Sequence, residues 1–254
     1  MKYSEIYKKW RDNPIEFWKK NAEDVSWIKF PEKILKKKSD YFYEWFSDGV
    51  LNTCYNAVDK NILEGRGDQV AIYYDSPITN SKSKLTYNEL KSKVEEFAGA
   101  LNKYNISKGD RVIVYMPMIP EAIIAVLAIA RIGAVHSVVF GGFAAKELAV
   151  RIDDCSPKII ISASCGIEPG RIVEYKPLLD EAIKLSNHKV KNCIIFQREQ
   201  LSVKLNTGFD ISWDEAIKDV KPADPVPVNG NDPLYILYTS GTTGQPKGVV
   251  RDNA

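Results

Sequence analysis

The sequence predicts an α/β fold, with a parallel sheet covered by helices on both faces. From about residue 61, short apolar runs of strand length alternate with longer segments whose apolar residues recur at helical spacing. The short runs are almost continuously apolar, which is typical of strands buried on both faces. The chain has 254 residues, of which 44% are hydrophobic and 27% charged, so it can form a sizeable core and is not wholly disordered.

The first sixty residues do not share this pattern, and we expect residues 1–60 to be an irregular, partly helical, aromatic-rich N-terminal extension. A helix is predicted to begin at Pro14, because proline suits the first helical turn and apolar residues follow at helical spacing. No strand alternation is visible. We expect the aromatic side chains to pack onto the main domain, and an aromatic binding platform is the alternative. Four of the five tryptophans lie here: Trp10, Trp18, Trp27 and Trp45.

The rest of the chain follows the alternating pattern. One helix is predicted after Thr86, which stands three residues before Glu89 in the capping-box spacing, and its apolar stripe ends at Leu101. Another is predicted from Pro120 to Ile132. The other expected segments are strands at 70–73, 111–116, 135–140, 158–162 and 192–196, helices at 144–154 and 178–185, a polar connector at 199–231 and a buried strand at 234–238.

The charge pattern argues against nucleic-acid and membrane partners. The chain has 35 Lys and Arg residues and 33 Asp and Glu residues, a net charge of +2, whereas nucleic-acid-binding proteins usually carry a concentrated basic excess. The only basic run, Lys36–Lys38, is expected to be a solvated loop. The most apolar region, Val112–Ala145, contains Glu121 and Arg131, and its uncharged runs are shorter than the roughly 20 residues that a membrane-spanning helix needs.

The cysteines and histidines predict neither a metal site nor a disulfide framework. None of the four cysteines stands in a C-x-x-C pair, and His136 and His188 are not spaced to complete a zinc site. Reduced thiols and an N-terminus without an apolar signal core favour the cytoplasm, or the mitochondrial matrix in a eukaryote. His136 is expected to be a packed residue at the start of a strand, and Cys155 and Cys165 to be unreactive.

The segment after the last predicted strand has the composition of a phosphate-binding loop. Glycines let backbone N–H groups approach a polyanion, hydroxyls are small donors, and a lysine adds positive charge. A Walker A loop is excluded, because Pro246 precedes Lys247 and Gly248 follows it. The proline disfavours a helix, so Lys247 is expected on an irregular loop that can move. An ordinary surface turn is the alternative. The expected ATP and phosphate ligands are Thr239, Ser240, Gly241, Thr242, Thr243, Gly244 and Lys247.

This loop also carries a resemblance to a known family. Residues 238–248 read YTSGTTGQPKG, which resembles the AMP-binding signature of the adenylate-forming enzymes, a group that includes acyl-CoA synthetases and luciferases. Similarity to the short-chain acetyl- and propionyl-CoA synthetases lies in the aromatic extension and in residues 115–121 and 130–143, while residues 166–171 and 249–253 look closer to the propionyl-CoA type. The resemblance covers nearly the whole chain.

The resemblance implies a fold and a reaction. Residues 61–254 would be the N-terminal portion of an AMP-binding, or adenylation, domain that is incomplete in this sequence. Enzymes of this type activate a short carboxylic acid, here propionate or acetate, with ATP and Mg²⁺ to give an acyl-adenylate, and coenzyme A then takes the acyl group and releases AMP. Lys247 would be the catalytic residue, since a donor loop stabilises the charge that builds on pyrophosphate.

The resemblance also implies a site for the nucleotide part of coenzyme A. The expected contacts are Phe140, Gly141, Gly142 and Arg171. In acetyl-CoA synthetases the segment that matches 168–171 commonly reads R-G-G-R, but here Glu168 replaces the first arginine and Pro169 a glycine. A phosphate contact from position 168 is therefore not expected. The alternatives are a tight turn for the two glycines and an ordinary surface position for Arg171.

Family members continue well past the glycine-rich loop, so we expect this chain to be an N-terminal fragment and to be inactive alone. Its expected partners are small molecules, namely the carboxylate, ATP and coenzyme A, together with the remaining part of the same enzyme. Two alternatives stay open. One is a non-catalytic nucleotide- or CoA-binding fragment or pseudogene product, and the other is a stand-alone NTPase, against which the missing Walker A pair counts.

Overall fold

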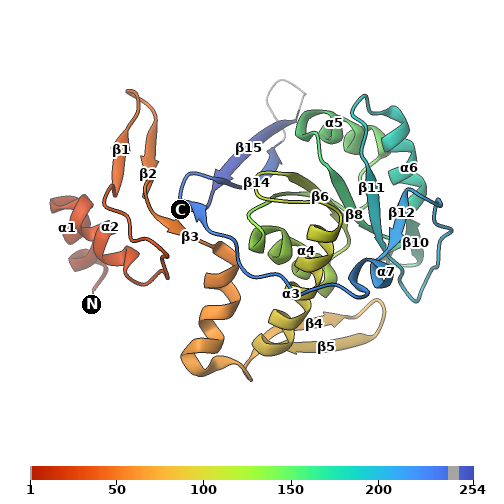
Figure 1. Ribbon diagram of the computed structural model, residues 1–254, viewed down its shortest axis with the longest axis horizontal. Helices are drawn as coiled ribbons and strands as arrows, with labels where there is room; N and C mark the ends of the chain where they lie inside the picture. Colours follow the sequence, from red (N-terminus) through yellow and green to blue (C-terminus); the bar gives the residue numbers. More distant parts are fainter. Residues whose placement is uncertain (1, 240–245) are drawn as a thin grey trace.

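The structure is a computed structural model that describes residues 2–239 and 246–254. Its centre is a seven-stranded sheet in which every neighbouring pair is parallel except the last, β14 with β15 (Figure 1). The sheet confirms the expected α/β class. In spatial order its strands are β12 (Asp210–Ser212), β11 (Asn192–Phe196), β8 (Ile159–Ala163), β6 (Arg111–Met116), β7 (Val135–Phe140), β14 (Pro233–Thr239) and β15 (Lys247–Asp252).

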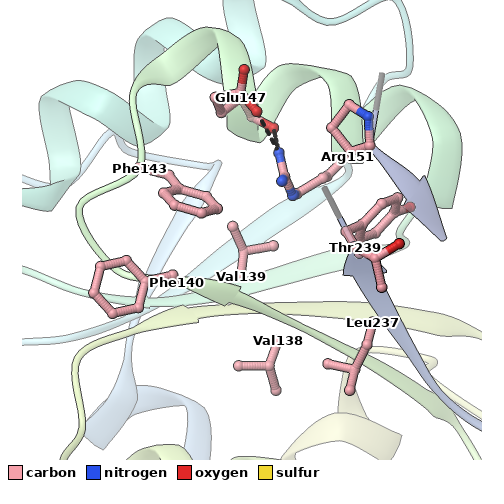
Figure 2. Close-up of a pocket in the computed structure, with 10 residues that line it drawn as sticks. Val138, Val139, Phe140, Phe143, Glu147, Arg151, Leu237 and Thr239 are labelled. Carbon is pink, nitrogen blue, oxygen red and sulfur yellow. Dashed lines mark hydrogen bonds and ion pairs between the residues drawn. The ribbon is translucent and has the colours of Figure 1, made fainter. Parts of the chain in front are cut away.

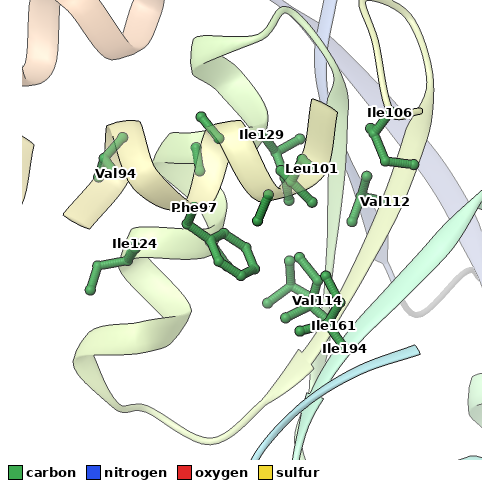
Figure 3. Packing of buried hydrophobic residues seen from close by; sticks show 14 of the residues in the cluster. Val94, Phe97, Leu101, Ile106, Val112, Val114, Ile124, Ile129, Ile161 and Ile194 are labelled. Carbon is green, nitrogen blue, oxygen red and sulfur yellow. The ribbon is translucent and has the colours of Figure 1, made fainter. Parts of the chain in front are cut away.

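Helices cover both faces of this sheet, as the continuously apolar strands predict. Along β6, Val112 and Val114 point to one face and Ile113 and Tyr115 to the other, and all four are buried. The first face packs against α3 and α4, with Phe97 completely buried at its centre (Figure 3). The second face packs against α5 and α6. These helices are α3 (Tyr87–Lys103), α4 (Pro120–Arg131), α5 (Ala145–Cys155) and α6 (Tyr175–Leu185).

Helices α3 and α4, which have the clearest start signals in the sequence, begin where the sequence predicts. The Oγ1 atom of Thr86 accepts a hydrogen bond from the Glu89 backbone N–H at 3.2 Å, and the Glu89 carboxylate accepts one from the Thr86 N–H at 2.8 Å. This reciprocal capping box satisfies two backbone donors at the start of α3. Helix α4 starts at Pro120 and is followed by Gly133, whose φ of +69° suits the glycine after a helix.

The N-terminal extension contains strands that its sequence does not reveal. Lys36 and Lys37 lie in β1, which pairs antiparallel with β2, so the basic run is largely a solvated strand and not the expected loop. Strands of only three residues are too short for alternation to be readable. The elements of this part are α1 (Tyr3–Asp12), α2 (Pro14–Ala22), β1 (Leu35–Lys37), β2 (Tyr43–Trp45), β3 (Val50–Leu51) and the short helices Tyr55–Asp59 and Ile62–Arg66.

The aromatic side chains of the extension pack mainly on one another, and the expectation that they cover the main domain is wrong. The rings of Trp18 and Trp45 lie 5.6 Å apart, and those of Trp27 and Phe46 lie 5.7 Å apart. Trp10 remains 38% exposed, and α1 buries none of its residues. In Figure 1 the two helices and the hairpin β1–β2 stand beside the main domain and reach it through β3.

Three further corrections concern segments after residue 60. The expected polar connector contributes β12 and the short helix α7, and the expected buried strand, β14, is only half-buried because it lies next to the sheet edge. The strand expected at residues 70–73 is confirmed as the start of a longer one, but its hairpin partner at residues 81–86 and the hairpin of residues 165–174 escape prediction, because these segments are short or polar. The remaining elements of this part are β4 (Val70–Ser76), β5 (Ser81–Thr86), β9 (Cys165–Glu168), β10 (Arg171–Glu174), α7 (Trp213–Ile217) and β13 (Val228–Asn229). None of the described helices is long and apolar enough to cross a membrane.

A buried charge network joins the extension to the main domain. Arg131, at the end of α4, is 1% exposed and makes two hydrogen bonds to Asp59, at 2.7 and 3.1 Å. Its guanidinium also contacts the Glu95 carboxylate at 2.7 Å and the Ala223 carbonyl at 2.7 Å. Nearby, the Asn52 amide donates to the carbonyls of residues 130, 131 and 226. Four segments distant in the sequence therefore meet around one cation.

Removing this cation is expected to destabilise the fold strongly. The variant Arg131→Met keeps the length of the side chain but leaves the buried Asp59 carboxylate without its cation, while Glu95 keeps its contact with Lys91, so the free energy of unfolding should fall by about 3–5 kcal/mol. Urea unfolding measures this loss. The control is Lys82→Ala, which breaks an exposed pair with Asp75 and should change stability by less than about 1 kcal/mol. Equal effects of the two variants would contradict the role given to Arg131.

Candidate functional site

A pocket of about 490 Å³ opens where β7 and β14 end and α5 begins (Figure 2). Because β7 and β14 run parallel, their carboxyl ends Phe140 and Thr239 meet at the same edge of the sheet. Ligands of open α/β sheets bind at this edge. The pocket is lined by Val138, Val139, Phe140, Phe143, Glu147, Arg151, Leu237, Tyr238, Thr239 and Pro246.

The pocket brings together residues that the sequence assigns to two different ligands. Phe140 comes from the expected CoA segment, whereas Thr239 and Pro246 flank the expected phosphate loop. Lys247 lies at the first position of β15, opposite Thr239 in the antiparallel ladder, so the expectation of an irregular loop at this residue is wrong. Its side chain is exposed. The other expected phosphate ligands, Ser240, Gly241, Thr242, Thr243 and Gly244, lie outside the described residues.

Helix α5 supplies polar side chains that the sequence analysis does not single out. The Arg151 Nη1 donates to the Glu147 carbonyl at 2.5 Å and to its carboxylate at 3.0 Å. The Tyr238 hydroxyl donates to the Asp154 carboxylate at 2.7 Å. Burial and this hydrogen bond raise the pKa of Tyr238, so the phenol stays protonated. Positions 147, 151 and 154 share one helix face, and this spacing of four and three residues is the signal that could have revealed them.

The two glycines of the expected CoA segment, Gly141 and Gly142, are required for different structural reasons. A Cβ on Gly141 would lie 2.3 Å from the Tyr175 hydroxyl oxygen, and a Cβ on Gly166 would lie 2.5 Å from the same atom. The tip of the buried Tyr175 ring therefore fits between these glycines, and burial raises the pKa of its phenol to about 12. Gly142 has open space around it and a φ of +96°, which favours glycine. The tight turn considered from the sequence is present here.

Arg171, the remaining expected CoA contact, does not line the pocket. It lies in β10 and makes contacts of 2.7 Å from Nε and 2.6 Å from Nη2 to the carboxylate of Glu168, the residue opposite it in β9. The side chain is 70% exposed. Glu168 stands where the R-G-G-R pattern has its first arginine, so Arg171 has an acidic partner in place of a second cation.

The histidine and the cysteines have the inert surroundings that the sequence predicts. His136 is the second residue of β7, its ring stacks on Tyr235 with centroids 5.6 Å apart, and its Nδ1 atom is buried without a hydrogen-bond partner. Burial lowers the pKa of His136 to about 4, so the imidazole is neutral at pH 7. All four cysteines are free and buried, and burial raises the pKa of both Cys54 and Cys155 to about 12.

Two family models match the sequence. The model of the AMP-binding enzymes covers residues 60–254, and the model of the acetyl-coenzyme A synthetase N-terminus covers residues 3–57. The chain belongs to the AMP-binding enzyme family. The expected resemblance is therefore confirmed for the family.

The chain is similar to several short-chain synthetases. The chain is 52% identical over 240 residues to acyl-CoA synthetase short-chain family member 3, mitochondrial, of Homo sapiens, a match covering 94% of this chain and 35% of the relative. It is 43% identical over 255 residues to the acetyl-coenzyme A synthetase of Yersinia pseudotuberculosis, a match covering 98% of this chain and 39% of the relative. The acetoacetyl-CoA synthetase from Streptomyces lividans superimposes with a TM-score of 0.86 at 25% identity, covering 96% of this chain and 37% of that one.

The fold of this AMP-binding family member is thus shared with a solved synthetase, as expected from the sequence. The chain spans 35% to 39% of the length of these relatives. Among residues 2–239 and 246–254, no group of three or more His, Cys, Asp or Glu side chains could hold a metal ion.

Replacing Gly141 with alanine tests the packing role of this glycine without any ligand. The added methyl group must displace the buried Tyr175 ring, so Gly141→Ala should lower the free energy of unfolding by about 1–3 kcal/mol. Urea unfolding of the single variant and of the pair Gly141→Ala with Tyr175→Leu measures it, and the loss should shrink in the background without the ring. An unchanged unfolding midpoint in Gly141→Ala would contradict the packing role.

The neutral His136 predicts a dependence of stability on pH. Between the ordinary pKa of 6.5 and the folded value of about 4, the unfolded chain binds a proton that the native chain does not. The contribution is therefore full above pH 6.5 and is lost as the pH falls toward 4. Relative to His136→Phe, which cannot ionise, the wild type should lose about 1–3 kcal/mol more between pH 7 and pH 4 in urea unfolding. Parallel pH profiles of the two proteins would refute this.

Proposed function

We propose that this chain forms the part of an AMP-forming short-chain acyl-CoA synthetase that faces the phosphates of ATP and the nucleotide of coenzyme A. The single observation that carries the proposal is the pocket in which Phe140 and Thr239 lie together. An adenylate-forming synthetase must hand the acyl group from one nucleotide ligand to the other. A site that borders both expected binding segments suits this transfer.

In this proposal the residues around the pocket have different roles in binding the two ligands. Thr239 and Lys247, opposite each other in the ladder between β14 and β15, flank the glycine-rich segment and supply a hydroxyl and a positive charge to the triphosphate. Ser240, Gly241, Thr242, Thr243 and Gly244 supply further donors. Fixed donors of this kind stabilise the charge that develops on the leaving pyrophosphate. Phe140, Gly141 and Gly142 border the CoA nucleotide, and Arg171 reaches its phosphate from the surface.

Mg²⁺ belongs to the proposal only as the counter-ion of ATP. The described residues contain no group of three or more His, Cys, Asp or Glu side chains that could hold it. The acid is a short carboxylate, as the printed names of the relatives suggest, and propionate stands ahead of acetate because residues 166–171 and 249–253 look closer to the propionyl-CoA type. We place the chain in the cytoplasm or the mitochondrial matrix, and the mitochondrial names of several relatives support the second compartment.

The longer relatives also suggest how the activity is completed. We propose that residues 1–60 form the extension and residues 61–254 the N-terminal portion of the adenylation domain. The adenine site, the acyl pocket and the C-terminal part of the enzyme would come from polypeptide that corresponds to the rest of the relatives. Short-chain carboxylate, ATP and coenzyme A are then the small-molecule partners, and that polypeptide is the protein partner.

A chimera tests this function directly. Residues 1–254 replace the matched region of the human relative, which is 52% identical, and acyl-CoA formation from propionate and acetate is measured with ATP and coenzyme A. The chimera should be active, and Lys247→Ala should lower its kcat/KM by roughly 10²–10³-fold, because one stabilising donor is lost.

The control for the chimera is Lys82→Ala, an exposed lysine distant in sequence from the loop, which should leave kcat/KM unchanged. A folded but inactive chimera that still binds ATP and coenzyme A in calorimetry would favour a non-catalytic binding module. Acyl-CoA formation by the 254-residue chain alone would contradict the need for further polypeptide.

A further inference from the structure

Arg151 has surroundings that the proposed ligand contacts do not explain. It lies on α5, is 7% exposed, and lines the pocket between the two expected binding segments. Figure 2 shows its side chain reaching from the helix between Phe143 and the end of β14 at Thr239. A buried arginine loses hydration, so its retention requires contacts that an apolar residue of the same size could not make.

The guanidinium contacts one aromatic ring from each side of the pocket. Its Cζ atom lies 4.9 Å from the ring centroid of Phe143 and 5.3 Å from that of Tyr238, both within the range of cation–π contacts. Phe143 follows the expected CoA residues Phe140–Gly142 directly, and Tyr238 directly precedes Thr239. One side chain therefore contacts the neighbours of both expected binding segments.

Hydrogen bonds fix Arg151 and the two aromatic residues that it contacts. Glu147, one helical turn earlier, accepts hydrogen bonds from Nη1 through its carbonyl and its carboxylate, which orients the guanidinium plane. The Tyr238 hydroxyl is held by Asp154 at 2.7 Å. The Phe143 carbonyl accepts a hydrogen bond from the buried Tyr115 hydroxyl at 3.0 Å. The arginine thus lies between two aromatic residues that other hydrogen bonds hold, and its own orientation depends on Glu147 in α5.

We propose that Arg151 is a positioning residue that couples the segment Phe140–Phe143 to the end of β14, so that the CoA side and the phosphate side of the pocket are held in one arrangement. The coupling itself is a statement about the structure of the chain. Its consequence for ligand binding rests on the proposed function. Arg151 acts through Phe143 and Tyr238 and needs no contact with a substrate.

Hydrogen exchange on the 254-residue chain tests the coupling without any ligand. In Arg151→Met the amides of β14 and β15 should exchange about 10-fold faster or more, while those of β6 and α3 keep their rates, because only the local restraint is lost. Arg151→Lys should behave like the methionine variant, since an ammonium group does not reproduce the planar contacts of guanidinium. Rates unchanged in β14 and β15, or raised equally everywhere, would overturn the proposal.

A double-mutant cycle distinguishes coupling from simple packing. Phe143→Leu removes the ring on the far side of Arg151 and should also speed exchange in β14, although residue 143 is not in that strand. In the Arg151→Met background the same substitution should have no further effect on β14. Additive effects would overturn the proposal. Because Phe143→Leu leaves the arginine in place, it provides the test if Arg151→Met does not fold.

The chimera with the human relative supplies the functional readout. Arg151→Met should raise the KM for ATP and the KM for coenzyme A together, each by about 10-fold, whereas a residue that touches one ligand changes one KM. Arg151→Lys should not rescue either value. An inactive parent chimera would count against the proposed function, and the exchange rates alone would then decide the coupling. If the parent chimera is active, and Arg151→Met changes neither KM or only one of the two, the coupling is overturned.

Discussion

Burial of the central strands on both faces determines where this chain can bind a ligand. Strands β6, β8 and β11 place apolar side chains against α3 and α4 on one side and against α5 and α6 on the other. Neither face of these three strands has room for polar chemistry, so the edge of the sheet where its strands end is the remaining position. At the carboxyl edge the parallel pair β7 and β14 brings Phe140 beside Thr239 although 98 residues separate them in the sequence.

The same constraint explains which parts of the fold the sequence predicts. Continuous apolar runs, such as residues 111–116, are unambiguous because a strand covered on both faces has no polar side. The capping residues Thr86 and Glu89 and the first-turn Pro120 act within a few residues of each other, so their effect is local and readable. In contrast, β12 is three residues long and joins the sheet only through its pairing with β11. A contact of that kind depends on tertiary structure and leaves no periodic pattern.

The site shows the same division between local and distant effects. The loop composition and the glycines can be recognised because they belong to short motifs. The helical spacing of Arg151 and Asp154 is also local, but it does not reveal their partners Phe143 and Tyr238, which lie in different segments and become neighbours only in the folded chain. Gly141 is a different case, because a Cβ at this position would collide with Tyr175 whether or not a ligand is bound. A glycine in a binding motif can thus have two independent reasons to be there.

The exposed strand β15 has a consequence for how the chain behaves in concentrated solution. It is one of the two edge strands of the main sheet, all six of its residues are exposed, and Val249 and Val250 are 36% and 56% exposed. An open strand of this kind is a template for pairing with the edge of another molecule, which begins aggregation. Lys247, Arg251 and Asp252 place charges at both ends of the valine pair, and charge on an edge strand opposes such pairing. The strand therefore carries the hazard of self-association and also the charges that oppose it.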